Sequence, residues 1–315
     1  MITKEENGND KITNIYQHVT DKIIASLEKE TAPWIKPWDN SGACFEIHRN
    51  AFTELSYRGI NILLLNLVAF DKGYTDPRWV TFNDVQKLGG SIKKGEHHTK
   101  IIFWKFLDET GAKNDHMDQT EDKKHARVIP LVRVHRVFNV QQCINLKLKE
   151  LPKINGGEIK GSIIDTAENI LTLPVVRYGG TRAAYVRSND CILMPPRESF
   201  ETIEHFYATG FHETVHWTGC ESRLNRTFGS RFGDQQYAFE ELVAEIGAAF
   251  LGGHVGLPFN KMRHPEYIKF WIQTLKDDNK AIFSACRFAQ SASDFILEKT
   301  KPQEFPAAGN VAAVQ

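Results

Sequence analysis

Apolar residues recur at helical spacing in several stretches of the chain. Over residues 11–30 they stand three or four positions apart and share one helix face: Ile12, Ile15, Tyr16, Val19, Ile23, Ile24 and Leu27. The same spacing predicts helices over 58–71 and 81–88, the second ending at Gly89-Gly90. Further along, a helix is predicted over about 163–171, and a long helix that follows Pro195-Pro196 is predicted to end near Gly219. Three more helices are predicted over about 235–251, 265–277 and 279–299.

Strand-like patterns occupy the middle of the chain. Residues 100–106 are rich in Ile, Phe and Trp, and apolar residues alternate over 128–138. The charged stretch 108–126 between them has no periodicity and is predicted to be a long hairpin loop. Two shorter strands are predicted at 184–186 and 191–194. The second is assigned as the edge strand of a sheet, along which an extended substrate peptide could bind.

Pro152, Gly156, Gly157 and several lysines mark 147–161 as the best linker candidate. We therefore expect an α+β protein with an α+β domain over 1–150 and a mostly helical domain with a small sheet over 158–300. Residues 301–315 are predicted to be a disordered tail.

Composition excludes several classes of protein. The 315 residues are 41% hydrophobic and 25% charged, as in soluble globular proteins. With 39 basic and 39 acidic residues the net charge is zero, so contact with nucleic acid requires a local patch. Five scattered cysteines favour reduced thiols. The polar N-terminus shows no apolar region of a signal peptide, and no apolar run is long enough for a membrane span. We expect a cytoplasmic protein without a membrane partner.

The run His212-Glu213-Thr214-Val215-His216 carries the strongest chemical signal. Two histidines four positions apart point the same way from a helix and can bind one Zn²⁺ ion, with Mn²⁺ as an alternative divalent metal. Glu213 would then lie at the open position of the metal and act as the catalytic base. The pattern arises by chance in about one chain in a hundred, so its surroundings decide.

Those surroundings offer a third ligand. Ser222 occupies the last position of the HExxHxxGxxH pattern and is a poor zinc ligand, which argues against that class. Glu241 and Glu245 lie four apart in an apolar helix, where carboxylates are costly to bury without a charge or a metal. We assign Glu241 as the metal ligand and Glu245 as the acceptor for the other ring N–H of a ligand histidine. Glu240 is the rival ligand.

Peptide hydrolysis also needs a hydrogen-bond donor or cation for the oxyanion. The candidates are Tyr237, His264 and Tyr267, although packing or surface roles are commoner for such residues.

Basic and aromatic residues interleave in the first half of the chain. Strands that carry cations to contact phosphates and aromatic rings to stack on bases are suited to binding single-stranded nucleic acid. The DNA-binding candidates are Lys93, Lys94, Lys100, Trp104, Arg133 and Arg136. Against this interpretation, aromatic residues on strands usually belong to the core.

Several motifs, in order, resemble those of the ArdC antirestriction family and the related N-terminal region of TraC primases. In the first half these are YRGIN at 57–61, WVTF at 79–82, LGGSIKKGE at 88–96 and RVFNVQ at 136–141. In the second half they are FHETVHWTG at 211–219, SRLNR at 222–226 and EELVAE at 240–245, followed by Tyr267-Ile268, Trp271 and Ala289-Gln290. The charged stretch 108–125 is longer than the family pattern suggests.

The resemblance implies an N-terminal domain that binds single-stranded DNA and a C-terminal zincin-like metallopeptidase domain. It implies metal ligands at His212, His216 and Glu241, with Glu213 in the catalytic position. Family members belong to mobile elements and protect incoming DNA from host restriction. Double-stranded DNA and a host restriction-modification component are further partners to consider.

Three functions therefore compete. The first is an antirestriction protein that binds DNA and whose zincin domain contributes to protection. The second is a cytosolic metallopeptidase without a DNA role. The third is a DNA-coating protein whose metal is purely structural.

Overall fold

The computed structural model describes residues 8–29, 32–35, 45–107, 129–150, 161–227, 235–257, 259 and 267–301. The whole predicted hairpin loop at 108–126, the predicted linker over 151–160 and the predicted tail from 302 onward lie outside these residues.

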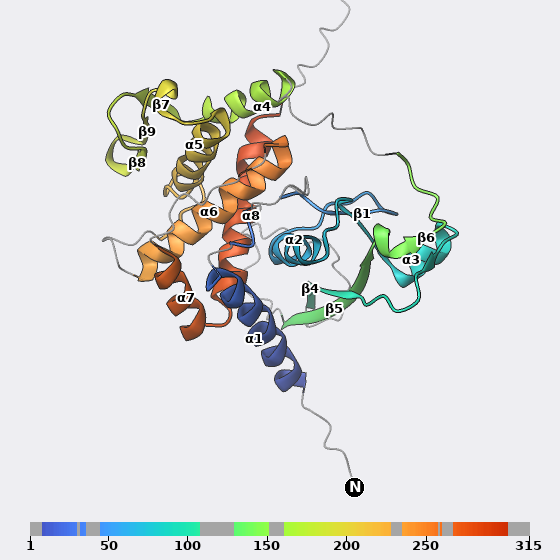
Figure 1. Cartoon of the computed structure of the whole chain (residues 1–315). Helices are drawn as coiled ribbons and strands as arrows, with labels where there is room; N and C mark the ends of the chain where they lie inside the picture. Colours follow the sequence, from blue (N-terminus) through green and yellow to red (C-terminus); the bar gives the residue numbers. More distant parts are fainter. Residues whose placement is uncertain are drawn as a thin grey trace, which may run out of the picture.

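The first half of the chain combines helices with a mixed sheet (Figure 1). Its helices are α1 (Gly8–Leu27), α2 (Ile60–Lys72) and α3 (Phe82–Lys87). The main sheet has the order β1-β2-β5-β4. Its strands are β1 (Arg49–Asn50), β2 (Arg78–Thr81), β4 (Thr99–Leu107) and β5 (Ile129–Asn139). The short strands β3 (Ser91–Ile92) and β6 (Cys143–Ile144) form a second pair. The predicted helices and the long hairpin are confirmed, whereas β1, β2, β3 and β6 are too short to give an alternating pattern.

The second half is mostly helical. It contains α4 (Gly161–Leu171), α5 (Ile203–Thr218), α6 (Gln235–Val255), α7 (Ile268–Asp277) and α8 (Ala281–Lys299). A small sheet beside them has the order β7-β9-β8. Its strands are β7 (Val175–Tyr178), β8 (Ala184–Val186) and β9 (Cys191–Met194). The expected α+β fold is therefore present.

One strand differs from its predicted role. The strand at 191–194, expected to be an edge, is the central strand β9. It pairs parallel with β7 on one side and antiparallel with β8 on the other, so its backbone hydrogen bonds are used within the sheet. The sequence missed β7, whose pairing makes β9 central, and the strand edge beside α5 belongs to β8.

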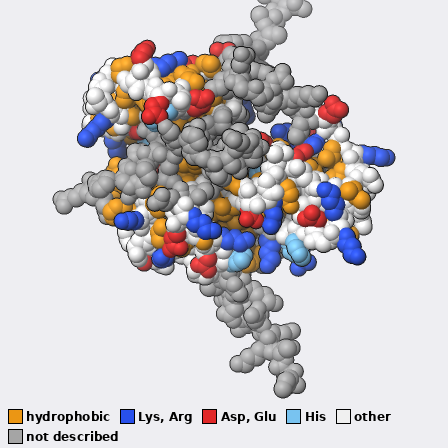
Figure 2. Space-filling view, in the orientation of Figure 1, with side chains coloured by type: hydrophobic (Ala, Val, Ile, Leu, Met, Phe, Trp, Pro, Cys, Tyr) orange, Lys and Arg blue, Asp and Glu red, His pale blue; other side chains and the backbone are white. Residues whose placement is uncertain are grey.

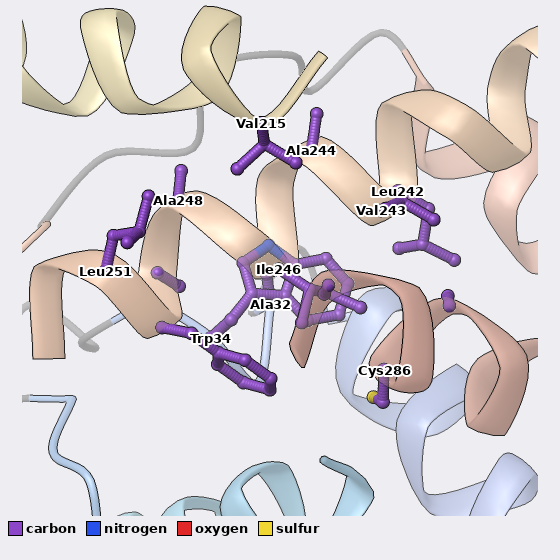
Figure 3. Close-up of a cluster of buried hydrophobic side chains, with 14 of the residues drawn as sticks. Ala32, Trp34, Val215, Leu242, Val243, Ala244, Ile246, Ala248, Leu251 and Cys286 are labelled. Atoms are coloured by element: carbon purple, nitrogen blue, oxygen red, sulfur yellow. The ribbon is translucent and has the colours of Figure 1, made fainter. Parts of the chain in front are cut away.

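A single hydrophobic core crosses the predicted domain boundary. Side chains of α1 and α2 belong to the same buried cluster as those of α5, α6 and α8. The Trp34 ring lies 5.8 Å from that of Trp271, and Figure 3 shows it among side chains of α6 and Cys286 of α8. The N-terminal helix therefore packs against the C-terminal half, as the position of α1 beside α7 and α8 in Figure 1 illustrates.

No helix in the described part of the chain combines the length and apolar character needed to cross a membrane.

Candidate metal centre

Helix α5 brings the HExxH residues together. Its N-terminus is capped by Thr202, whose hydroxyl accepts a hydrogen bond from the backbone N–H of His205 at 3.2 Å. The helix ends at the expected glycine, Gly219. The 3.6-residue period turns both histidines toward α6, and the two histidines and the glutamate of the motif are buried: His212, Glu213 and His216.

Helix α6 supplies the facing carboxylate. His212 Nε2 lies 3.1 Å from His216 Nε2. Glu241 reaches both rings, with Oε2 at 3.3 Å from His212 Nε2 and Oε1 at 3.5 Å from His216 Nε2. These three residues form the one cluster among the described residues whose ligand atoms could hold a metal ion, with those atoms within 4.8 Å of one another.

The dimensions of this triangle fit a small divalent ion. Ligands at 2.0–2.1 Å from a tetrahedral Zn²⁺ lie about 3.4 Å apart. The two imidazole nitrogens lie 3.1 Å apart, and each lies 3.3 or 3.5 Å from one oxygen of Glu241. Two imidazole nitrogens that face each other can share only one proton, so a cation completes the arrangement better than hydrogen bonds do. The donor set is therefore suited to a metal.

Glu240 faces away from this triangle, although it is the neighbour of Glu241. Its Oε1 lies 3.2 Å from His216 Nδ1, the ring nitrogen opposite the triangle. Arg226 donates to both oxygens of this carboxylate, at 2.7 and 3.1 Å. Glu240 thus contacts the outer nitrogen of His216, and the contact of Glu245 to a ligand histidine stays a prediction. Sequence reasoning did not single out Arg226, whose signal was a cation shortly after the motif.

Buried charges shift the pKa values of these groups. Burial alone would lower the pKa of His216, but Glu240 and Glu241 outweigh it and raise the pKa to about 10. Burial would raise the pKa of Glu241, yet His212 and His216 hold it well below its usual range. His216 and Arg226 likewise outweigh burial and lower the pKa of Glu240. Both carboxylates are therefore anionic and stabilise a positive charge between them.

Strand β8 orients Glu213. The backbone N–H of Tyr185 donates a 2.8 Å hydrogen bond to Glu213 Oε2. The Tyr185 hydroxyl in turn contacts Asp190 Oδ1 at 2.8 Å and Arg223 at 3.2 Å. The carboxylate that sequence analysis assigned to catalysis is thus fixed to the edge strand of the small sheet. The sequence predicted the strand at 184–186 but gave no signal for this contact, because the contact joins segments that are distant along the chain.

The three residues considered for stabilising the oxyanion have different positions in the structure. Tyr237 precedes Glu241 by one helical turn, and burial followed by the charge of Glu241 raises its pKa. Its ring lies 5.9 Å from that of Tyr267, which is itself buried against Trp271. His264 lies outside the described residues. Tyr237 is therefore a candidate that lies beside the charge of Glu241.

The residues predicted to bind DNA do not form one surface. Lys100 on β4 pairs with Arg136 on β5, so both side chains lie on one face of the sheet. Arg133 lies an odd number of residues from Arg136 and points to the other face. Lys93 donates to the backbone carbonyl of Gln141 at 2.7 Å. Lys94 is exposed, and the side chain of Trp104 lies outside the described residues.

Two family models match the chain. The N-terminal domain of anti-restriction factor ArdC matches residues 13–138, and a zincin-like metallopeptidase family matches residues 166–288.

Solved structures and whole-chain relatives agree with these models. The metal-free structure of the antirestriction protein ArdC from plasmid R388 is 34% identical, with 90% of this chain and 97% of that chain covered and a TM-score of 0.72. Its Mn(II)-bound structure gives a TM-score of 0.70 over 92% of this chain and 99% of that one. The uncharacterised protein y4eC of Sinorhizobium fredii is 32% identical, over 90% of this chain and 92% of its own. DNA primase TraC of Escherichia coli is 34% identical over 90% of this chain, which spans only 27% of that primase.

Proposed function

The chain belongs to the ArdC antirestriction family, and on that premise we propose that it protects incoming DNA of a mobile element from host restriction. In this proposal the first domain, at 1–150, binds single-stranded DNA. The second, at 158–300, carries a metallopeptidase-type site. The matches to an ArdC N-terminal model and a zincin-like model support this division of labour. Action on incoming DNA implies a place in the cytoplasm.

We further propose that His212, His216 and Glu241 bind a divalent metal, with Zn²⁺ as the expected ion and Mn²⁺ as the alternative. The observation that carries this proposal is the meeting of two imidazole nitrogens, 3.1 Å apart, with one carboxylate whose two oxygens lie 3.3 and 3.5 Å from them. Three protein ligands are typical of catalytic zinc sites, whereas structural sites use four. This favours a catalytic role over a purely structural metal.

The residues around the triangle suit peptide hydrolysis. A bound divalent ion would supply Lewis acidity, which polarises a carbonyl group and acidifies water at neutral pH. Glu213, held at Oε2 by the Tyr185 N–H, would take a proton from the attacking water and pass it to the leaving amine. Tyr237 would donate its hydroxyl proton in a hydrogen bond to the oxyanion. Glu240 would keep His216 oriented through Nδ1.

Metal analysis separates the two adjacent carboxylates. Glu241→Ala should lose bound metal almost completely, because it removes a direct ligand. Glu240→Ala should retain the metal with affinity reduced by about 10–100-fold, since only the outer contact to His216 is lost. If instead Glu240→Ala alone abolishes metal binding, the ligand assignment is wrong.

Catalysis is tested with Glu213→Gln, which preserves shape and removes the base. The variant should keep the metal content of the wild type. Its hydrolysis of a denatured protein such as casein should fall by about 10²–10⁴-fold. Equal hydrolysis by both proteins would show that Glu213 is not the base.

The same pair of proteins tests the antirestriction role. Protection of incoming DNA by wild type and by Glu213→Gln is measured in parallel in a restricting host. Loss of protection in the variant would point to a host restriction-modification component as the peptidase substrate. Unchanged protection would mean that DNA binding alone protects, and absence of protection by the wild type would favour a peptidase without a DNA role.

A further inference from the structure

A groove of about 1380 Å³ lies between the β4–β5 hairpin and the first two helices. The wall formed by β4 and β5 includes Lys100, Ile102, Val134 and Arg136. Helices α1 and α2 form the opposite side, and the loop before β4, with His97 and His98, closes one end. Sequence analysis foresaw only Lys100 and Arg136 among its basic residues. His18, Lys22 and Lys72 lie on helices far along the chain from the hairpin.

Cations from several elements converge on this groove. The basic residues in its lining are His18 and Lys22 from α1, Lys72 from α2, His97, His98 and Lys100 from β4 and its preceding loop, and Arg136 from β5. His135 also borders the groove, but its position in β5 places its side chain on the same face as that of Arg133. Lys72 pairs with Asp71 at 3.3 Å. Within the described part of the chain, Lys22, Lys100 and Arg136 form no ion pair. Three permanent cations therefore line the groove without an ion pair, together with the carboxylates of Asp71 and Glu96.

The histidines respond to this charge. Burial, with Lys22 and Lys100 beside it, lowers the pKa of His18. Burial, with Arg136 and Lys100, likewise lowers the pKa of His98. Two histidines on separate elements thus respond to the same positive field, although the whole chain carries no net charge. Figure 2 shows Lys, Arg and His side chains gathered at the lower edge of the molecule, where β4 and β5 lie in Figure 1.

The floor of the groove is apolar. Ile15, Val19, Leu64 and Val68 contribute from the helices, and Ile102 and Val134 from the sheet. Apolar surface beside cations suits a ligand with apolar flat groups along a chain of negative charges. Unstacked bases and phosphates have this combination, whereas a duplex hides its bases from such a surface.

We propose that the groove between α1, α2 and the β4–β5 hairpin holds the backbone of single-stranded DNA, with Lys22, Lys100 and Arg136 on its phosphates. This inference rests on the proposed DNA-binding function and names the surface that performs it. It excludes Arg133, on the opposite face of β5, from the binding site.

The α1 side of the groove is held by the metallopeptidase half. Thr20 Oγ1 donates to the backbone carbonyl of Asn279 at 2.7 Å, and the Tyr16 ring meets that of Phe283 edge-on at 4.7 Å. Lys22 and His18 lie on this same helix. The groove consequently needs both halves of the chain, and the full-length protein is the form to test.

The test uses full-length protein and a labelled oligothymidylate of about 20 nucleotides, longer than a typical binding site for a single strand. Affinity is measured by fluorescence anisotropy over a range of salt concentrations. Lys22→Gln, Lys100→Gln and Arg136→Gln should each weaken binding about fivefold near 0.1 M salt. Each should also reduce the slope of log K against log salt by about 0.7, the value for one lost phosphate contact. Arg133→Gln and Lys94→Gln are the matched controls and should bind as the wild type does.

The possible outcomes distinguish failure of the proposed groove from failure of the proposed DNA-binding function. If the wild type binds but the groove variants bind equally well, or the controls weaken as much, the groove is the wrong surface while DNA binding stands. If the wild type does not bind the oligonucleotide at all, both the groove and the proposed DNA role fail. If a duplex of equal length binds as tightly and with the same dependence on these cations, the ligand is not specifically a single strand.

Discussion

Gly247 on α6 lies so close to Val215 on α5 that a Cβ atom at position 247 would meet Val215 Cγ2 at 2.8 Å. Val215 is the residue before His216, and Gly247 lies fewer than two turns from Glu241. This contact sets how closely the helix with the two histidines approaches the helix with the carboxylate. Glycine costs about 1 kcal/mol in a helix interior, and here it permits the close approach that the metal triangle needs.

Gly247→Ala should therefore weaken metal binding without altering a ligand. The added methyl group meets a β-branched, fully buried side chain that cannot easily turn aside, so the helices must separate. We expect metal affinity to fall by at least about tenfold, the loss typical for a disturbed ligand environment. Isothermal titration with Zn²⁺ measures it.

Gly210→Ala is the control for this prediction. A Cβ atom there would meet Leu171 Cδ2 at 2.6 Å, on the α4 side of α5. Leu171 presents the end of a flexible side chain, so adjustment is easier and the metal triangle should stay intact. Equal loss of metal affinity in both variants would show that general destabilisation, and not helix spacing at the site, is responsible.

Arg226 should be essential to the stability of the site. It is buried and donates to Glu240, to Thr218 Oγ1 and to the backbone carbonyl of Val215. Arg226→Met leaves the Glu240 carboxylate buried without its main cation, which costs about 3–5 kcal/mol. Thermal unfolding measures this loss.

The double variant Arg226→Met/Glu240→Met should recover part of that stability, because it removes the uncompensated charge as well. A double variant as unstable as the sum of the single variants would indicate that the ion pair itself contributes little.

His48 should make the fold sensitive to acid. It accepts a hydrogen bond at Nδ1 from the Trp79 indole N–H at 3.1 Å, and burial lowers its pKa to about 4. Because the pKa is lower in the folded than in the unfolded chain, stability is complete above about pH 6.5 and is lost as the pH falls toward 4. The loss between about pH 7 and pH 5 amounts to about 2 kcal/mol. Urea unfolding across this range measures it.

His48→Gln can still accept from the indole but does not titrate, so its unfolding midpoint should vary less with pH. The exposed His97→Gln serves as the control and should keep the wild-type profile. A wild-type profile for His48→Gln as well would assign the acid sensitivity to other groups.

Residues 1–150 alone should not form a stable domain that includes α1. Val19, Ile23, Leu27 and Trp34 would lose the C-terminal helices that cover them, and each buried side chain of this kind contributes about 2 kcal/mol. Limited proteolysis should cleave α1 rapidly in the fragment and slowly in the full chain. Equal protection of α1 in both would show that the first domain is independent, as the predicted boundary at residues 150–158 implies.

The sequence by itself determined the local features of this protein. The spacing of His212 and His216, the glycine that ends their helix and the apolar setting of Glu241 follow from helical periodicity and the cost of burying charge. The long helices and the β4–β5 hairpin are also visible in the sequence, because their patterns extend over many residues.

Only the tertiary structure decided which of these features meet. It turned Glu240 toward Arg226, bound Glu213 to the backbone of Tyr185, made β9 a central strand and placed α1 beside both the hairpin and α8. The two-residue strands β1, β3 and β6 have no readable period, and contacts between distant segments depend on how side chains fill a shared core. The metal triangle was foreseen because two of its members lie on one helix, whereas the basic groove draws its side chains from four separate segments.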